Sequence, residues 1–342
     1  MDKKIFQGKM QHYYQSHTDL ADPQVSLDWV NDQGWESEIY AFTLNFGPTN
    51  QRRSVKRVLR LLTGASHSDA SGEYRILTLL NKAGYPVPSV YALECADESF
   101  GYPFIVMDCI EGGNFAARFP ASPGDDQQPL HDFIVLFRNL HTLDWRQYFA
   151  NAEQVAPLDD PYFHFDREMA LYKSVLSQAG VTELAPVLDW LSDQRKRAFC
   201  AASSVVHRDF HPDNILEDEQ GDLFVIDWTS AEISDYRFDL AWTLTLALAY
   251  RGDAIRDAIL DGYERQLGQS VPDLDVFLVA AILRRIGTVM VSLGAGADAL
   301  GMRPETVNAM RKDRIPLERL YQHLVRLTGL SHPAIRTFVS NL

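Results

Sequence analysis

Four side chains suited to moving a phosphoryl group lie within one short stretch of the sequence, between Val205 and Asp227. They belong to His207, Asp209, Asn214 and Asp227. A carboxylate in a loop, such as Asp209, can orient an acceptor hydroxyl and take its proton. Asn214 and Asp227 offer the oxygen ligands that Mg²⁺ prefers. The residue types and their spacing therefore suit transfer of a phosphoryl group to an alcohol.

The elements that must position these residues are predicted to be short strands. Apolar residues at 205–206, 215–216 and 223–226 indicate three strands, and Gly221 lies in a polar stretch typical of a hairpin turn. The polar side chains then fall at strand ends and in loops, where a scaffold can hold them toward one cleft. A surface hairpin rich in His and Asp is the alternative, and it requires all of these features to coincide.

The motif HRDFHPDN, followed by VIDW and FDLAW, resembles the aminoglycoside phosphotransferase and choline kinase superfamily. Members usually have Gly where this chain has Arg208, a departure toward protein kinases. Trp228 and Thr229, however, replace the Phe-Gly of eukaryotic protein kinases. Twelve positions separate Asp227 from Asp239, which leaves no room for the activation segment of a protein kinase. A small acceptor is therefore favoured over a protein.

The resemblance implies a role for each polar residue of the stretch. Asp209 would be the catalytic carboxylate, Asn214 and Asp227 would hold Mg²⁺, and His207 would support the catalytic loop by packing and hydrogen bonding. Asp239 would open a helix over residues 239–250 and hold the backbone of the loop. A carboxylate favoured by the dipole at a helix N-terminus is an equally good interpretation of Asp239.

A basic strand and the helix after it carry the expected phosphate contact. Alternation in residues 54–62 places Lys56, Val58 and Arg60 on one face. Arg60 fits the family position that grips the phosphates of ATP, and Glu73, which opens a helix over 73–83, is its expected ion-pair partner. The family more often has Lys at this position, and a guanidinium is larger and binds bidentately. A solvated strand with a surface ion pair of little value is the alternative.

Two further segments are expected to contact the nucleotide. The loop over residues 31–38, between strands at 25–30 and 39–46, contains Gly34 and Ser37, whose backbone N–H groups and hydroxyl suit phosphates. Without the catalytic stretch, this loop is an ordinary hairpin turn. The segment 105–113 resembles a kinase hinge, in which the backbone from Asp108 to Ile110 meets a purine edge and Met107 forms an apolar wall.

Composition indicates one large domain or two lobes. The chain has 342 residues, of which 46% are hydrophobic, enough to bury a sizeable core. Its three widely spaced cysteines fit a reducing compartment better than a disulfide framework. The net charge of −14 disfavours nucleic acid and anionic membranes as partners.

Hydropathy predicts a cytoplasmic chain. The N-terminus lacks the apolar core of a signal peptide. The longest apolar run, residues 276–300, is interrupted by Arg284 and Arg285, so it is interpreted as a buried helix and not as a membrane span. The chain does not indicate an oligomeric state.

The predicted fold is α+β and protein-kinase-like, with two lobes that bind ATP and Mg²⁺. Residues 1–108 form a small lobe with an antiparallel sheet and one helix, and residues 109–342 form a large, mainly helical lobe. Hydrophobic spacing predicts helices in both lobes. They are expected at residues 2–17, 73–83, 130–143, 165–178, 182–200, 239–250, 253–267, 274–293 and 304–327. His141, near the end of one of them, is expected to be a hydrogen-bonded core residue.

The acceptor is not defined by the sequence. Acidic and aromatic residues of the large lobe would suit an amine-bearing alcohol through charge or cation–π contacts. They are Asp159, Asp160, Glu232, Asp235 and Trp242. An aminoglycoside, a choline-like amine, an amino alcohol and a sugar all remain open. A nucleotide-binding pseudokinase that scaffolds a partner is the alternative from another class, and a protein kinase is the third.

Overall fold

The computed structural model describes residues 2–31, 37–63, 70–95, 100–122, 124–148, 160–300, 307, 310–311 and 314–342. The chain divides into two compact units. The first contains Met1–Gly113 and Leu216–Thr229, and the second contains Asn114–Ile215, Ser230–Leu300 and the C-terminal residues. This division differs from the predicted boundary at residue 108. The backbone N–H of Val225 donates to the carbonyl of Pro86 at 2.9 Å, and this bond ties the later segment Leu216–Thr229 to the rest of the first unit.

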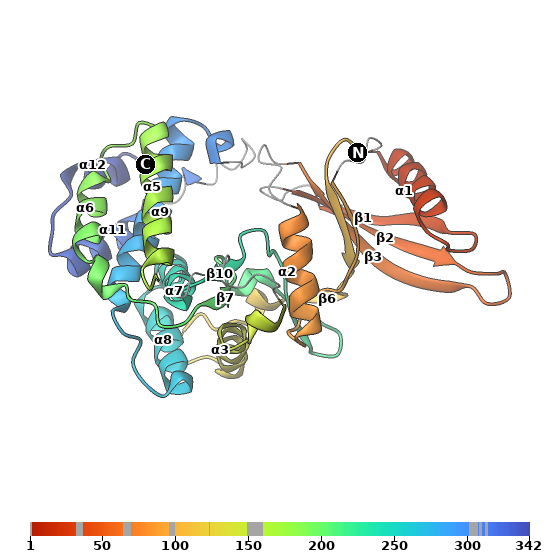
Figure 1. The fold of residues 1–342 in the computed structure, drawn as a ribbon, viewed down its shortest axis with the longest axis horizontal. Coiled ribbons are helices and arrows are strands. Elements are labelled where there is room, and N and C mark those ends of the chain that lie inside the picture. The colour runs from red at the N-terminus through yellow and green to blue at the C-terminus, as the bar shows by residue number, and fades with distance from the viewer. Residues whose placement is uncertain are drawn as a thin grey trace. The chain divides into compact units, whose positions relative to one another are not determined.

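The first unit is built on one antiparallel sheet and two helices (Figure 1). The strand order is β1-β2-β3-β5-β4. The strands are β1 (Gln24–Asn31), β2 (Ser37–Phe46), β3 (Arg53–Leu62), β4 (Val90–Glu94) and β5 (Phe104–Asp108), and the helices are α1 (Lys3–His17) and α2 (Ala70–Lys82). The predicted sheet and both predicted helices are confirmed.

Helix α1 covers the sheet through one apolar stripe. Asp2 caps it by accepting a hydrogen bond from the backbone N–H of Lys4. Phe6, Met10 and Tyr14, spaced four residues apart, are buried together against the strands. The ring of Phe6 stacks on Tyr40 with centroids 4.8 Å apart.

The hairpin that carries Asp227 packs in the first unit. It consists of β8 (Ile215–Asp218) and β9 (Leu223–Val225), and β8 also pairs with β6 (Gly112–Asn114). A Cβ atom at Gly112 would lie 1.9 Å from the carbonyl oxygen of Glu217, so only glycine permits this approach. The Trp228 ring meets Tyr85 edge to face at 5.9 Å.

The second unit is mainly helical. Its helices are α3 (Gln128–His141), α5 (Phe163–Gln178), α6 (Ala185–Asp193), α7 (Tyr236–Arg251), α8 (Asp253–Leu267), α9 (Leu274–Gly294), α11 (Arg314–Thr328) and α12 (Pro333–Ser340). Short 3₁₀ turns are η1 (Phe115–Ala117), η2 (Trp145–Tyr148), η3 (Arg195–Arg197), η4 (Pro212–Asn214) and η5 (Ala297–Leu300). Strands β7 (Ser204–Val206) and β10 (Glu232–Ser234) pair antiparallel. The predicted α+β class is confirmed.

Helix α9 forms the centre of the second unit and packs against α7, α6 and α11. By length and composition it is apolar enough to cross a membrane, but 83% of its most apolar window is buried inside the structure. The prediction of a buried helix is therefore confirmed.

Several predicted boundaries differ from the structure. The helix expected over residues 182–200 is shorter, because α6 ends at Asp193 and η3 follows it. Helix α7 begins at Tyr236 and not at Asp239, because the Asp235 carboxylate caps it by accepting from the N–H of Arg237. Of the helix expected over 304–327, residues 314–327 lie in α11.

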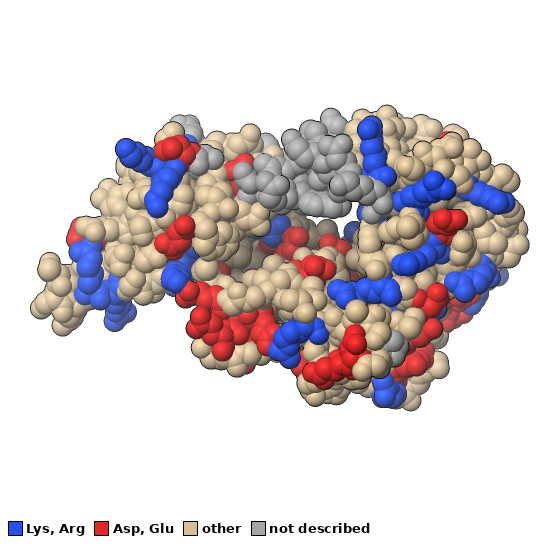
Figure 2. All heavy atoms as spheres, turned by 180° about the vertical axis from the view of Figure 1, so that it is seen from behind, with Lys and Arg blue, Asp and Glu red and all other residues tan. Residues whose placement is uncertain are grey.

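Lys and Arg side chains are interspersed with Asp and Glu on the face shown in Figure 2.

Candidate active site

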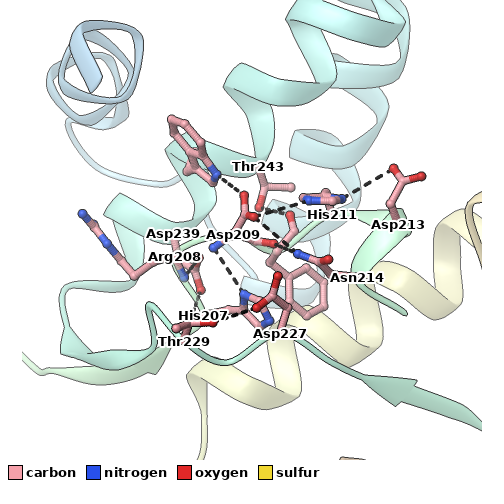
Figure 3. Close-up of polar contacts among 12 residues, drawn as sticks. His207, Arg208, Asp209, His211, Asp213, Asn214, Asp227, Thr229, Asp239 and Thr243 are labelled. Atoms are coloured by element: carbon pink, nitrogen blue, oxygen red, sulfur yellow. Dashed lines mark hydrogen bonds and ion pairs between the residues drawn. The ribbon is translucent and has the colours of Figure 1, made fainter. Parts of the chain in front are cut away.

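The catalytic loop follows β7 and turns sharply at Arg208. The φ of Arg208 is 69°, in the left-handed region that glycine adopts most easily. This conformation fits the Gly that the superfamily resemblance implies at this position. The turn directs the backbone N–H groups of His207 and Arg208 to one carboxylate, that of Asp239, at 2.7 and 2.8 Å (Figure 3).

Asp239 lies in the first turn of α7 and is fully buried. Its other partner is His141, whose Nε2 lies 3.2 Å from Oδ2, while His141 Nδ1 lies 2.8 Å from the Tyr263 hydroxyl. Burial would raise the pKa of Asp239, but the bonds from His141 and from the His207 N–H outweigh it and lower the pKa. The predicted roles of Asp239 as a holder of the loop and of His141 as a hydrogen-bonded core residue are confirmed.

Side chains from the helices also hold the carbonyl groups of the loop. The Arg284 guanidinium donates to the carbonyl of Arg208 at 2.9 Å, and the Thr243 hydroxyl donates to the carbonyl of Phe210 at 2.7 Å. The Asn214 amide nitrogen donates to the carbonyl of Asp209 at 2.9 Å. The loop conformation is therefore fixed by α7, α9 and its own residues together.

The Asp209 carboxylate is held at both oxygens (Figure 3). The indole N–H of Trp242 donates to Oδ1 at 2.7 Å, and His211 Nε2 lies 3.5 Å from Oδ2. Burial favours a raised pKa for Asp209, but the hydrogen bonds from His211 and Trp242 and the charge of Arg284 hold its pKa well below the usual range. Asp209 is therefore ionised at neutral pH.

His211 bridges Asp209 and Asp213. Its Nδ1 lies 3.5 Å from Oδ2 of Asp213, opposite the contact with Asp209. Burial alone would lower the pKa of His211, but the bonds to the two carboxylates raise it to about 9. The sequence interpretation gave His211 no role. Its signal was a second histidine two positions after Asp209, in a loop already rich in carboxylates.

His207 is completely buried beneath the loop. Its Nδ1 accepts the N–H of Asp209 at 3.2 Å, so in a neutral ring the proton lies on Nε2. His207 therefore supports the catalytic loop by packing and hydrogen bonding, as the resemblance implies.

The two predicted metal ligands belong to different compact units. Asn214 commits its amide nitrogen to Asp209, which leaves its side-chain oxygen directed to other partners. Asp227 has φ of 66° and a side chain that is 44% exposed, and its Oδ1 accepts the Thr229 hydroxyl at 2.8 Å. Both residues present the oxygen atoms that Mg²⁺ requires. Among the described residues, no three His, Cys, Asp or Glu side chains gather into a metal site of their own.

Arg60 and Glu73 form the expected ion pair within the first unit. Arg60 Nη1 lies 2.7 Å from Glu73 Oε1, and both side chains are buried. Arg60 Nη2 reaches Asp227 Oδ1 at 2.8 Å and the Thr229 hydroxyl at 2.9 Å. Burial raises the pKa of Glu73, with the charge of Arg60 opposing it. The alternative of a solvated surface pair is therefore wrong.

The other predicted nucleotide contacts differ in outcome. Gly34 lies outside the described residues, and Ser37 is buried at the start of β2, opposite Leu62. Met107 pairs with Val58 across the sheet.

The hinge has one backbone donor fewer than expected. The N–H of Asp108 donates to the carbonyl of Ser89 at 2.9 Å, so it does not serve a purine. The Asp108 carboxylate is also engaged, because it accepts the Tyr91 hydroxyl at 2.7 Å. The contact of the Cys109 and Ile110 backbone with a purine stays a prediction.

The carboxylates expected to bind an amine are already paired with arginines. Glu232 pairs with Arg167 and, at 3.6 Å, with Arg208. Asp235 binds Arg237 at 2.6 Å, with both side chains buried. These carboxylates do not form a site for a cationic acceptor, because guanidinium groups occupy them.

The remaining acceptor residues also have other contacts. Asp159 lies outside the described residues, and the Asp160 carboxylate accepts the N–H of Tyr162 at 3.0 Å. The Trp242 ring faces the Arg284 guanidinium at 3.9 Å, so a cation already covers it. The sequence missed these pairings because they join residues far apart in the chain.

The sheet with α2 and the helical unit that carries this loop define a protein-kinase-like fold. The sequence model of the phosphotransferase enzyme family matches residues 31–276, so the chain belongs to that family. The HRDFHPDN motif resembles the small-molecule kinases of this family.

Solved structures share this fold. A protein from Ralstonia eutropha assigned as an aminoglycoside phosphotransferase has a TM-score of 0.62 and 18% identity, over 92% of this chain and 98% of that chain. The Plasmodium vivax ethanolamine kinase has a TM-score of 0.57 and 13% identity, over 91% and 83%. A choline kinase from Streptococcus pneumoniae has a TM-score of 0.53 and 17% identity, over 93% and 99%. At these identities the likeness extends to the protein-kinase-like fold.

Proposed function

We propose that the protein transfers the terminal phosphoryl group of ATP, with Mg²⁺, to a hydroxyl group of a small molecule. The observation that carries the proposal is the Asp209 carboxylate, held at Oδ1 by Trp242 and at Oδ2 by His211 on a loop whose backbone Asp239 fixes. A fixed, ionised carboxylate suits the task of orienting an acceptor hydroxyl.

The low pKa of Asp209 defines its part in the reaction. A carboxylate stabilised as an anion is a weak base, so its main contribution is to accept the hydrogen bond of the acceptor hydroxyl and to aim the oxygen. As the acceptor oxygen bonds to the phosphoryl group, its proton moves to Asp209.

Arg60 supplies positive charge in the first unit. The Glu73 pair and the Thr229 hydroxyl hold the guanidinium in one orientation, where it can contact the phosphates of a nucleotide. Asp227 and Asn214 would hold Mg²⁺, which neutralises phosphate charge when bound. Both offer oxygen atoms, and Asp227 is accessible.

Nucleotide complexes of other proteins with this fold support the choice of phosphoryl donor. A mutant of the aminoglycoside phosphotransferase APH(4)-Ia was crystallised with ADP and hygromycin B, at 17% identity to this chain. LicA was crystallised with AMP, also at 17% identity.

The experiment is to measure ADP release from MgATP across a panel of alcohols and a generic protein substrate. We expect turnover with a subset of the alcohols, and we expect Asp209→Asn and Asp227→Asn to reduce it by about 10²–10⁴-fold. Asp261→Asn, on the surface of α8, is the matched control and should leave turnover unchanged. Turnover by Asp209→Asn equal to that of the wild type would refute the proposal, and turnover with the protein substrate alone would refute a small acceptor.

A further inference from the structure

Arg284 places a guanidinium over the Trp242 ring, whose indole N–H binds the Asp209 carboxylate. It extends from α9, and its guanidinium lies 3.9 Å from the centre of the Trp242 ring. The same indole donates to Asp209 at 2.7 Å. The Arg284 residue is partly buried, at the surface of the helical unit and not fully enclosed in its core.

Neighbouring cations in this cluster have carboxylate partners. Arg208 is buried against Glu168 and also contacts Glu232 at 3.6 Å, and Glu232 in turn pairs with Arg167. The two glutamates are therefore committed to Arg208 and Arg167.

Arg284 has no carboxylate partner among the described residues. Its hydrogen bond to a described residue runs from Nη1 to the carbonyl of Arg208, which is neutral. A guanidinium carries several further N–H donors in a planar fork that matches carboxylates and phosphates. Burial lowers the pKa of Arg284 and the charge of Arg208 adds to this effect, whereas Tyr172, Glu168 and Asp209 oppose it.

We propose, building on the proposed function, that the acceptor alcohol carries an oxyanion, a carboxylate or a phosphate, which binds Arg284 while its hydroxyl meets Asp209. An anionic acceptor beside Asp209 needs a fixed cation to offset repulsion between the two negative groups, and Arg284 supplies it. An ammonium group at the same place would meet the guanidinium instead of a free carboxylate.

The test compares alcohols that differ in charge on one carbon frame. Glycerol is neutral, glycerate carries a carboxylate, glycerol 3-phosphate carries a phosphate, and 3-aminopropane-1,2-diol carries an ammonium group. Phosphorylation of each is measured with MgATP, and calorimetry measures binding of each to the protein. We expect glycerate and glycerol 3-phosphate to bind and react best. Comparison of the two shows whether the site prefers a carboxylate or a phosphate.

Variants assign the effect to Arg284. Arg284→Gln should raise KM or Kd for the oxyanion compounds by about 10- to 100-fold, the loss expected for charge-assisted hydrogen bonds. It should lower kcat/KM for glycerol, which carries no oxyanion, by a much smaller factor than for glycerate or glycerol 3-phosphate, and Arg284→Lys should restore part of the affinity for these two. Arg167→Gln is the matched control, because it removes a cation of the same cluster that is already paired with Glu232.

Two outcomes would overturn the inference while leaving the proposed function intact. One is preference for the neutral or ammonium alcohols, with turnover that depends on Asp209 but not on Arg284. The other is an absence of Arg284-dependent oxyanion binding in calorimetry while hydrolysis of ATP still depends on Asp209. ADP release that is equal in wild type and Asp209→Asn would instead refute the proposed function itself.

Discussion

Asp209 shows how neighbours decide the task of a single carboxylate. Trp242 holds Oδ1, and the positive charge of His211 lies 3.5 Å from Oδ2. Both partners favour the anion, so the side chain gains orientation and loses basicity. The lower basicity of Asp209 reduces the rate of phosphoryl transfer little, because most of the rate gain comes from positioning and charge neutralisation.

His211 predicts how stability should depend on pH. Its pKa in the folded protein, about 9, lies above the ordinary value of 6.5. The protonated ring therefore stabilises the fold fully below pH 6.5, and this stabilisation is lost as the pH rises through 9. We expect the free energy of unfolding to fall by on the order of 2 kcal/mol between about pH 7 and 10.

The measurement is urea unfolding at a series of pH values. His211→Asn should remove this fall, whereas His131→Asn, at an exposed position of α3, should keep it. An equal fall in the His211→Asn variant would show that other groups cause the pH dependence.

At the scale of elements, the catalytic loop depends on the contact of Arg208 with α5. Arg208→Gly would relieve a left-handed backbone conformation that costs a side chain about 1–2 kcal/mol. It would also leave Glu168 buried without its partner, which costs about 3–5 kcal/mol. The second effect is larger, so we expect a net loss of stability of about 1–4 kcal/mol, measured by chemical denaturation.

The double variant Arg208→Gly, Glu168→Gln separates the two effects. Removing the buried charge as well should recover most of the lost stability, because a neutral amide is less costly to bury than a carboxylate. A single variant as stable as the wild type would mean that the ion pair contributes nothing to holding the loop.

The approach of β6 to β8 gives a prediction with a matched control next to it. Gly112→Ala places a methyl group 1.9 Å from the carbonyl oxygen of Glu217 and 2.8 Å from Cα of Asp218, so the backbone of β8 must move. We expect a loss of at least about 2 kcal/mol and weaker nucleotide binding, since the same hairpin leads to Asp227. Thermal unfolding and calorimetry with ADP measure the two effects.

Gly113→Ala tests the cause, because a Cβ atom at Gly113 meets nothing within 4 Å. It should unfold at nearly the wild-type temperature. If the two alanine variants behave alike, the loss reflects flexibility of glycine and not the close approach of the strands.

Elements with long periodic patterns could be predicted from the sequence, and short ones could not. The apolar stripes of α1 and α9 defined these helices to within a residue or two. Strand β10 has three residues and becomes a strand only by pairing with β7, which lies far from it in sequence. The end of α6 likewise has no proline or glycine to mark it.

The candidate site divides in the same way. Motif spacing predicted Asp209, Asn214, Asp227 and the Arg60–Glu73 pair, because these residues lie at fixed offsets along the chain. The partners of Glu232 could not be predicted, because Arg208 and Arg167 reach it only after folding. The sequence alone does not distinguish an exposed acidic residue from one that is ion-paired in the folded protein.

At the scale of the whole molecule, the chain does not divide into two consecutive lobes. It leaves the first unit after Gly113 and returns at Leu216–Thr229 before continuing into the second unit. The returning segment completes the first unit, because Trp228 packs on Tyr85 and the N–H of Val225 bonds to Pro86. A predicted boundary at one position cannot describe such a topology.

This topology predicts that residues 1–113 alone will fold poorly. Without residues 216–229, the buried Arg60 side chain loses its contacts with Asp227 and Thr229, and strand β6 loses its neighbour β8.

Joining residues 1–113 to 216–229 through a short Gly/Ser linker should restore cooperative unfolding, followed in urea by circular dichroism. The joined fragment carrying Trp228→Ala should fall between the two, because the packing on Tyr85 is lost while the backbone bond to Pro86 stays. Equal urea midpoints for the short and the joined fragments would show that the returning segment adds no stability to the first unit.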